Sequence, residues 1–431
     1  MENKIIYPFS NLSKIENLII SNKNLHSSWV EDSVGNHFYN ISNASLTMGA
    51  ANPEIINEIT EQYKKLSTGL LIGQGHTSAM ELANKLISIF PSFSQVFFSN
   101  DGTGCIEASL KIARQYYLQK GFINKKKFIS FSGAYHGTSY GSFSLSNIGV
   151  KEIYGPTLEK CIEAPFPNTF KSELTSENEV RTKIKEMEEI IAREGADKIA
   201  AIIIEPIQSV SGVRVVPKEY LSELKKISKS NDILLIFDEV TTGIGRAGEW
   251  SVNNLHNIDV DIINFSKGLT AGYFPLGVTL VKSDIKDSLI TMGFPHGSTL
   301  AGHPVGCAIS QKVLTIIEES NLISNAVVYG KLIKKELENN LVNHPFFGQI
   351  RGEGLMIGVE FVNNQDDKNP PPQHFQRIFT EELYKKGMLT LFSNGILSLY
   401  PPLNVSSIDA DFIIESIITS ANSAIKNSNS N

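Results

Sequence analysis

Lys267 stands in a sequence setting that favours a reactive amine. It follows the apolar run "IINF" (262–265) and precedes Gly268, and the segment 262–277 contains no acidic residue that would neutralise it. Burial lowers the pKa of a lysine, and a neutral amine attacks carbonyl carbon. The sequence therefore predicts that Lys267 is a nucleophile.

Asp238 is expected at the same place in the fold. It directly follows the run "ILLIF" (233–237), which has the pattern of a buried parallel strand, and Lys267 follows the next predicted strand, "DIINF" (261–265). An acidic residue at a strand end often serves only as a helix cap or a loop anchor. Because ligands of open α/β sheets bind at the carboxyl ends of the strands, the convergence of Asp238 and Lys267 favours a ligand site.

The turn "SNDGTGCIEA" (99–108) adds a candidate anion site. It joins a predicted strand to a predicted helix, so the backbone N–H groups of Gly102 and Thr103 would lie at the positive end of that helix, where a phosphate is stabilised. The turn does not match the dinucleotide fingerprint GxGxxG, because Glu107 stands where the third glycine would be.

Together, an isolated lysine, a buried carboxylate and a phosphate site meet the requirements of pyridoxal 5′-phosphate. The amine forms a Schiff base with the coenzyme aldehyde, the carboxylate keeps the pyridine nitrogen protonated, and the helix N-terminus holds the phosphate. The sequence predicts this coenzyme, with Lys267 and Asp238 as the catalytic residues.

Short apolar runs alternate with helical patterns through the middle of the chain, which is typical of parallel strands joined by crossover helices. The predicted strands are residues 95–99, 127–131, 200–205, 233–237, 261–265 and 277–281, and helices are predicted over 103–119 and 217–230. From about residue 306 the pattern changes to helices over 306–319, 324–341 and 375–387, a strand over 355–361 and a closing helix.

A chain of 431 residues is too long for one ordinary single-core domain. The pattern predicts an α/β fold, with a large domain whose mostly parallel sheet is flanked by helices and a smaller α+β domain. We place the large domain at residues 46–305 and the small domain at 306–431, and we expect residues 1–45 to join the small domain.

The bulk composition limits the partners and the compartment. A net charge of −6 argues against nucleic acid, and no apolar run reaches the length of a membrane span. The first residues lack the pattern of a secretory signal, so we expect a cytoplasmic protein. The three cysteines, Cys105, Cys161 and Cys307, are far apart and form no CxxC pair, which fits reduced thiols rather than disulfides or a metal site.

Six segments in order resemble the successive motifs of class III aminotransferases, which are fold type I, vitamin B6-dependent enzymes. The segments are "FFSNDGTGCIEASLKIARQYY", "SGAYHGTSYGSFSLS", "IIIEPIQSVSG", "LLIFDEVTTGIGRAGEW", "SKGLTAGYFPLG" and "STLAGHPVGCA". The resemblance extends from about residue 28 to residue 415.

The resemblance implies roles for four residues around the coenzyme ring. Lys267 would carry the coenzyme and, once the substrate amine has displaced it, move the proton between the substrate carbon and the coenzyme carbon. Asp238 would pair with the pyridine nitrogen. Val240 would pack against one face of the ring, and Tyr135 would stack on the other.

The phosphate would be held by Gly102 and Thr103, and Thr299 would reach the phosphate of the neighbouring protomer, so the resemblance implies a homodimer. Glu205 and Gln208 of "EPIQ" either lie near the coenzyme, as in the family, or only tie the strand end to its loop.

Two further residues of these motifs are interpreted as structural. His136 would be a satisfied loop histidine. Arg246 would be a surface charge or, following the family pattern, would lie by the ring-contact loop without a catalytic role.

The chain departs from the family at the substrate end. Many members bind a substrate carboxylate with an arginine near the C-terminal "PPL", in some cases shielded by a glutamate. Here Val210 stands at the glutamate position, and no arginine occurs after Arg377. A buried carboxylate without a cation is costly, so we expect a preference for neutral or apolar substrates. The phosphate turn is closer to the form seen in diaminopelargonate aminotransferases.

The leading hypothesis is a ping-pong aminotransferase that moves nitrogen from an amine donor to an aldehyde or ketone acceptor. The alternative within the family is an aminomutase resembling glutamate-1-semialdehyde aminomutase. Two readings from other classes are a coenzyme-binding protein without catalysis and a nucleotide-dependent α/β enzyme; the retained lysine and aspartate argue against the first, and the failed dinucleotide pattern argues against the second.

Overall fold

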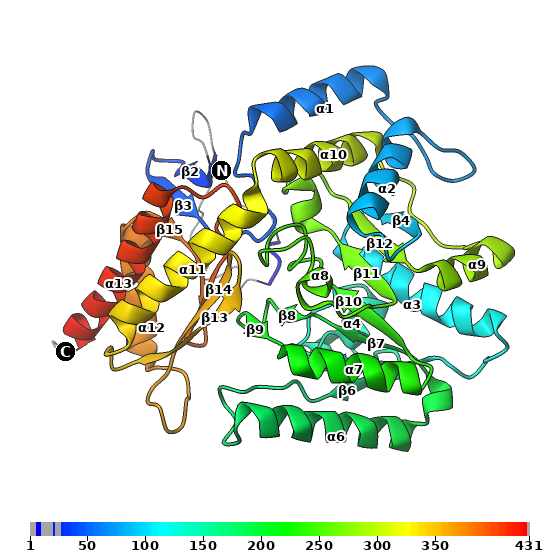
Figure 1. Ribbon diagram of the computed structural model, residues 1–431. Coiled ribbons are helices and arrows are strands. Elements are labelled where there is room, and N and C mark those ends of the chain that lie inside the picture. The colour runs from blue at the N-terminus through cyan, green and yellow to red at the C-terminus, as the bar shows by residue number, and fades with distance from the viewer. Residues whose placement is uncertain (1–5, 10–19, 22–26, 429–431) are drawn as a thin grey trace.

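A seven-stranded sheet forms the centre of the larger part of the molecule (Figure 1). The computed structural model describes residues 6–9, 20–21 and 27–428. In spatial order the strands of this sheet are β4 (Gln95–Ser99), β12 (Gly277–Val281), β11 (Ile262–Phe265), β10 (Leu234–Asp238), β7 (Ile199–Ile204), β5 (Lys127–Phe131) and β6 (Cys161–Ala164). All are parallel except β12, which is antiparallel to both of its neighbours.

Helices cover both faces of this sheet (Figure 1). In chain order the helices of this part are α1 (Pro53–Lys65), α2 (Thr77–Ile89), α3 (Gly102–Gln119), α4 (Tyr140–Leu145), α5 (Lys151–Tyr154), α6 (Ser176–Glu194), η2 (Ala196–Lys198), α7 (Lys218–Ser230), α8 (Val252–His256), η3 (Lys267–Thr270), α9 (Ser283–Met292) and α10 (Pro304–Glu319). A two-stranded ribbon, β8 (Ile207–Gln208) with β9 (Arg214–Val215), follows β7.

The central strands are apolar along their whole length because both of their faces are buried. Ile203 and Ile236 lie in the core formed with α3, whereas Ile202 and Leu235, one position earlier, lie in the core formed with α6 and α7. Every residue of β7, β10, β11 and β12 is buried. The sheet is therefore a rigid support for residues at its carboxyl edge.

The C-terminal part is built on an antiparallel sheet packed against long helices. Its strands, in spatial order, are β13 (Phe347–Glu353), β14 (Met356–Phe361), β17 (Ile396–Leu399) and β16 (Leu391–Ser393), and its helices are α11 (Leu322–Leu341), α12 (Gln373–Lys385) and α13 (Ser407–Ser428). In Figure 1 these elements, yellow to red, lie beside the larger part.

N-terminal strands pair with the C-terminal part. β1 (Ile20–Ser21), β2 (Trp29–Asp32) and β3 (His37–Asn40) form a sheet with β15 (Met388–Leu389), in which Met388 pairs with Tyr39. The domain boundaries at residues 45 and 305 stay a prediction, and part of the segment 1–45 (residues 1–5, 10–19 and 22–26) lies outside the described residues.

The predicted fold class is confirmed, and the predicted strands agree with the structure to within one residue at each end. Two features of the main sheet differ. β6 was not predicted, and its pattern "CIEA" contains only four residues, of which Ala164 alone is buried. β12 is antiparallel because residues 266–276 contain only the single turn η3, whereas a parallel crossover needs about a dozen residues and usually a helix.

Candidate active site

Asp238 and Lys267 lie at the carboxyl ends of neighbouring strands. β10 and β11 pair in parallel with Asp238 opposite Asn264, and the N–H group of Glu239 donates to the carbonyl oxygen of Asn264 at 3.0 Å. Lys267 begins η3, directly after this strand. The register thus brings both residues to one edge of the sheet, where the Asp238 carboxylate acts electrostatically on the Lys267 amine.

The Asp238 carboxylate is buried and fixed through both oxygens. Oδ1 accepts a hydrogen bond from the backbone N–H of Val240 at 3.1 Å, and Oδ2 lies 2.7 Å from Nδ1 of His136. An ionised carboxylate only accepts, so Nδ1 carries the hydrogen. The other ring nitrogen, Nε2, is buried and has no partner within the described part of the chain. The interpretation of His136 as a satisfied loop histidine is therefore wrong.

Lys267 has a strained backbone and a half-buried side chain. Its φ of 38° lies in the left-handed region, which is uncommon for residues other than glycine and is found at functional positions. Its Nζ donates to Oγ1 of Thr241 at 2.6 Å. Burial lowers the pKa of this amine, and the nearby carboxylates of Asp238 and Glu205 oppose that shift. The sequence analysis did not identify Thr241. Its position directly after Val240, the residue expected at the coenzyme ring, is the signal that could have indicated it.

The start of α3 leaves backbone donors free for an anion. Asp101 caps the helix, and its Oδ1 accepts from the N–H of Gly104 at 2.7 Å. Because the first N–H groups of a helix have no partner within it, those of Gly102 and Thr103 remain for an external acceptor. A small cavity of about 220 Å³ adjoins this turn and is lined by Asp101, Thr103 and Ser298 among others.

Gly102 also touches the residue expected at the coenzyme ring. A Cβ atom at Gly102 would lie 2.7 Å from Cγ1 and 2.9 Å from Cγ2 of Val240. The phosphate turn and the loop after Asp238 are therefore in direct contact, and only a glycine permits this approach.

Glu205 and Gln208 tie the end of β7 to neighbouring loops. Glu205 Oε1 accepts from the N–H of Tyr135 at 2.9 Å, and its Oε2 accepts from the N–H of Ser209 at 3.3 Å. Gln208 Nε2 donates to the carbonyl oxygen of Ser132 at 3.0 Å. Burial raises the pKa of Glu205 to about 7, opposed by His136 and reinforced by Asp238. Both residues therefore hydrogen-bond to neighbouring loops, which is one of the two alternatives left open by the sequence. Contact of either residue with the coenzyme stays a prediction.

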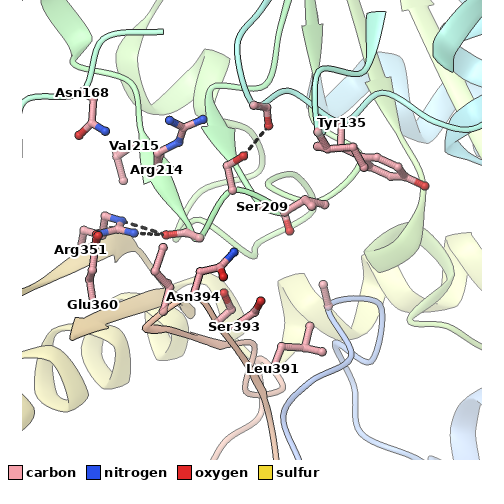
Figure 2. A pocket seen from close by; sticks show the side chains of 18 of the residues that line it. Tyr135, Asn168, Ser209, Arg214, Val215, Arg351, Glu360, Leu391, Ser393 and Asn394 are labelled. Carbon is pink, nitrogen blue, oxygen red and sulfur yellow. Dashed lines mark hydrogen bonds and ion pairs between the residues drawn. The ribbon is translucent and has the colours of Figure 1, made fainter. Parts of the chain in front are cut away.

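A cavity of about 1060 Å³ opens beside these residues and contains Lys267, Tyr135, Val210, Arg214, Arg351 and Tyr400 in its lining. Figure 2 shows Tyr135 on the side opposite Arg351 and Glu360, with Ser209 between them. The cavity is thus bounded by segments from both parts of the molecule. Lys267 belongs to its lining, and the charged side chains of Arg351 and Glu360 lie on the side opposite Tyr135.

Arg246 is not a surface charge. It is fully buried and donates to the carbonyl oxygens of Ala44 at 3.2 Å, Leu355 at 3.2 Å and Pro401. Burial lowers the pKa of Arg246 to about 10. The surface reading is therefore wrong, and the residue links three segments of the chain.

Thr299 is exposed, in the loop between α9 and α10, and it does not line the large cavity. Its chain neighbour Ser298 lines the small cavity at the start of α3. The predicted contact of Thr299 with a neighbouring protomer stays a prediction.

The described residues fit pyridoxal phosphate. The Lys267 amine, a carboxylate held at the neighbouring strand end and the first N–H groups of α3 meet at one edge of the sheet. These are the three attachments that the coenzyme requires. The close approach of Gly102 to Val240 joins the expected phosphate site to the expected ring site.

Comparison with known proteins points the same way. A family model described as "Aminotransferase class-III" matches residues 13–420. The chain is 31% identical over 418 residues to an adenosylmethionine-8-amino-7-oxononanoate aminotransferase of Staphylococcus aureus, a match that covers 93% of this chain and 92% of that protein. It is 30% identical over 421 residues to a probable gamma-aminobutyrate transaminase 3 of Oryza sativa, covering 90% and 81%.

Solved structures agree over nearly the whole chain. An amine transaminase from an uncultivated Pseudomonas species, in its PLP-bound form, has a TM-score of 0.93 at 28% identity and covers 98% of this chain and 99% of that one. An omega transaminase from Pseudomonas jessenii in complex with PMP has a TM-score of 0.92 at 29% identity, covering 98% and 96%. An (S)-enantioselective omega-transaminase from Thermomicrobium roseum has a TM-score of 0.91 at 30% identity, covering 97% and 96%.

Proposed function

This chain belongs to the class III aminotransferases, and on that basis we propose that it moves an amino group from a small-molecule amine to an aldehyde or ketone by a ping-pong mechanism. Pyridoxal phosphate is its coenzyme, since related structures contain PLP or PMP. The observation that carries the proposal is the convergence of Lys267, Asp238 and the start of α3 at one edge of the sheet.

Lys267 is the residue that would bind the coenzyme and then move the proton. When bound, the coenzyme supplies an electron-withdrawing ring that stabilises negative charge at the substrate carbon. Burial lowers the pKa of the Lys267 amine, so a larger fraction of it is neutral and able to accept a proton at Nζ. Thr241 Oγ1, 2.6 Å away, orients that amine.

Asp238 would stabilise the protonated pyridine nitrogen of the coenzyme. Its carboxylate is buried, and His136 fixes Oδ2 through a hydrogen bond of 2.7 Å. A fixed carboxylate in a site that excludes water stabilises a cation more strongly than a mobile one does. We therefore assign Asp238 to the pyridine nitrogen and His136 to the positioning of Asp238.

The other expected contacts with the coenzyme are assigned from the positions of the residues relative to Lys267 and Asp238. Tyr135 and Val240 would contact the two faces of the ring. Gly102 and Thr103 would hold the phosphate through backbone N–H groups. Thr299 would complete the phosphate site of a partner subunit in a homodimer.

The substrate end lacks an arginine from the C-terminal stretch 388–402, and Val210 is exposed there at the gate position. The amine donor and carbonyl acceptor would therefore be recognised by other residues of the cavity. Among the described residues no helix is long and apolar enough to cross a bilayer. The cytoplasmic location stays a prediction.

The decisive test separates the two half-reactions. The holoenzyme is mixed with an amine alone, and conversion of the coenzyme to its amino form is followed by absorbance; an added aldehyde should then restore the original spectrum. An aminomutase would instead turn over one substrate without any donor. Borohydride reduction should fix the coenzyme on Lys267, as read by peptide mass. A colourless protein that binds nicotinamide nucleotides would refute the proposal.

A further inference from the structure

The side of the large cavity that lies away from Tyr135 carries an excess of positive charge. Lys171, Arg214 and Arg351 line it, and Glu360 is the one carboxylate among the described lining residues. These four side chains carry a net charge of +2 when all are ionised. Figure 2 shows Arg214, Arg351 and Glu360 on the same side of the cavity, away from Tyr135.

Two of the three cations already share Glu360. Arg351 Nη1 donates to Glu360 Oε2, and Lys171 Nζ lies 3.5 Å from Oε1 of the same carboxylate. Arg351 also donates through Nη2 to the carbonyl oxygen of Gly212 at 2.6 Å. The hydrogen-bonding capacity of Arg351 is therefore largely used.

Arg214 differs because no carboxylate pairs with it within the described part of the chain. Its Nη2 donates to two neutral acceptors, the carbonyl oxygen of Ser132 at 3.1 Å and Oε1 of Gln208. Its Nε is buried and has no partner among the described residues, and its guanidinium lies 4.8 Å from the ring centre of Phe166. Arg214 is thus a largely desolvated cation on which Glu205 and Glu360 act electrostatically, but neither carboxylate is in ion-pair contact with it.

The position of Arg214 is built into the backbone. Gly133 has a φ of 72°, and a Cβ atom there would lie 2.0 Å from Arg214 Nη2 and 2.6 Å from Ser211 Oγ. Only a glycine leaves room for the guanidinium against this loop. The loop that bears Tyr135 therefore also holds Arg214 at the cavity wall.

We propose that Arg214 binds a carboxylate carried by the substrate at the end remote from the reacting carbon, with Arg351 and Lys171 adding positive potential. A guanidinium matches the geometry of a carboxylate and forms strong hydrogen bonds with it in a site of low polarity. The inference rests on the proposed function, because it takes the amine or carbonyl end of the substrate to lie at Lys267.

This assignment changes the expectation of a neutral substrate. That expectation considered only the C-terminal stretch, which lacks arginine. In the folded chain Arg214 of β9 and Arg351 of β13 reach the same cavity from other segments. Arginines outside the C-terminal stretch can therefore bind a substrate carboxylate in this cavity.

The test compares matched substrates that differ only in the remote group. For the donor half-reaction these are 5-aminopentanoate and pentylamine, and for the acceptor half-reaction 5-oxopentanoate and pentanal. Each is run as a single turnover on the wild-type holoenzyme, on Arg214→Met and on Arg214→Lys. Arg181→Gln, a change at an exposed arginine on α6, is the matched control.

The wild-type enzyme should favour the carboxylated member in at least one half-reaction. In Arg214→Met the preference for the carboxylated member, taken as the ratio of the two second-order rate constants of the half-reaction, should fall by about 10- to 100-fold, the range expected for loss of a charged hydrogen bond. Arg214→Lys should restore part of the ratio, and Arg181→Gln should keep it. Structural damage alone would slow both members of a pair equally and leave the ratio unchanged. The half-reaction that responds identifies whether the donor or the acceptor carries the carboxylate.

A binding measurement separates this inference from the proposed function. Glutarate has two carboxylates and neither an amine nor a carbonyl group that can react, so its affinity for the holoenzyme by calorimetry reports the subsite without turnover. Arg214→Met should weaken glutarate binding by about 10-fold or more. Equal substrate ratios and equal glutarate affinities in wild type and Arg214→Met would overturn the inference. Absence of any half-reaction alongside normal glutarate binding would overturn the proposed function instead.

Discussion

Replacing Gly102 with alanine should weaken coenzyme binding through a single steric contact. The new Cβ would lie 2.7 Å and 2.9 Å from the two γ-carbons of Val240. Carbon atoms in contact prefer about 3.5–4.0 Å, so Val240 would have to withdraw by roughly 1 Å. The backbone itself accepts the change, because Gly102 is not among the residues of positive φ and alanine favours helix at this position.

The size of the effect follows from the cost of overpacking. Forcing an extra carbon into a packed site costs about 1–3 kcal/mol. In the coenzyme-bound state Val240 would also contact the ring and could not move away. The strain should therefore destabilise that state and raise the dissociation constant of pyridoxal phosphate by about 5- to 150-fold. The measurement is an equilibrium titration of the coenzyme-free protein with pyridoxal phosphate, followed by absorbance.

A double-mutant cycle isolates the contact. Val240→Ala removes both γ-carbons, so Gly102→Ala combined with Val240→Ala should bind the coenzyme within about threefold of Val240→Ala alone, because the strain is gone. Gly75→Ala is the control, since a Cβ there meets no atom of the described residues within 4 Å and its φ is not positive. Additive losses in the double variant, or wild-type affinity in Gly102→Ala, would refute the assignment of Gly102 and Val240 to the coenzyme site.

Three further predictions concern the charged groups. Lys267→Ala should abolish turnover and leave the coenzyme bound non-covalently, because phosphate and ring contacts remain; spectra and dialysis check this, and measurable transamination would contradict it. Asp238→Ala should remove most activity by releasing the pyridinium proton, and wild-type rates would show that another residue is the nitrogen partner. Glu205 has a folded pKa of about 7, above its ordinary value of 4.5, so its stabilising contribution is complete below pH 4.5 and is lost as pH rises through 7. Between pH 5 and 8 the coenzyme-free wild type should lose on the order of 3 kcal/mol of unfolding free energy from this group, and Glu205→Gln should flatten the profile; parallel urea-unfolding profiles would contradict the buried carboxylate.

The fold was predictable because its strongest signals are local. The strands β4, β5 and β12 begin and end at the predicted residues, since buried strands of this sheet type are short apolar runs bounded by turn residues. The edge at which Asp238 and Lys267 lie followed from the rule that parallel strands share a carboxyl edge. Neither inference needed a contact between distant residues.

The remaining features depend on contacts that no local pattern encodes. His136 lies against Asp238 across 102 positions of the chain, and Arg214 reaches Ser132 across 82. A motif names the residue types in one segment but not the partner from another. The burial of Arg246 likewise depends on Leu355 and Pro401, both more than a hundred positions away.

Arg246 explains how the loop that follows Asp238 is kept rigid. Burying a guanidinium without a carboxylate is costly, and here three carbonyl oxygens from three segments offset that cost. Within the same loop Glu239 accepts from the N–H groups of Val252 at 2.7 Å and Asn253 at 2.9 Å. The loop is thus anchored at its start by a buried carboxylate and at its end by a buried cation. Thr241, the partner of the Lys267 amine, lies between these anchors, so the position of the amine depends on contacts made by the C-terminal part of the chain.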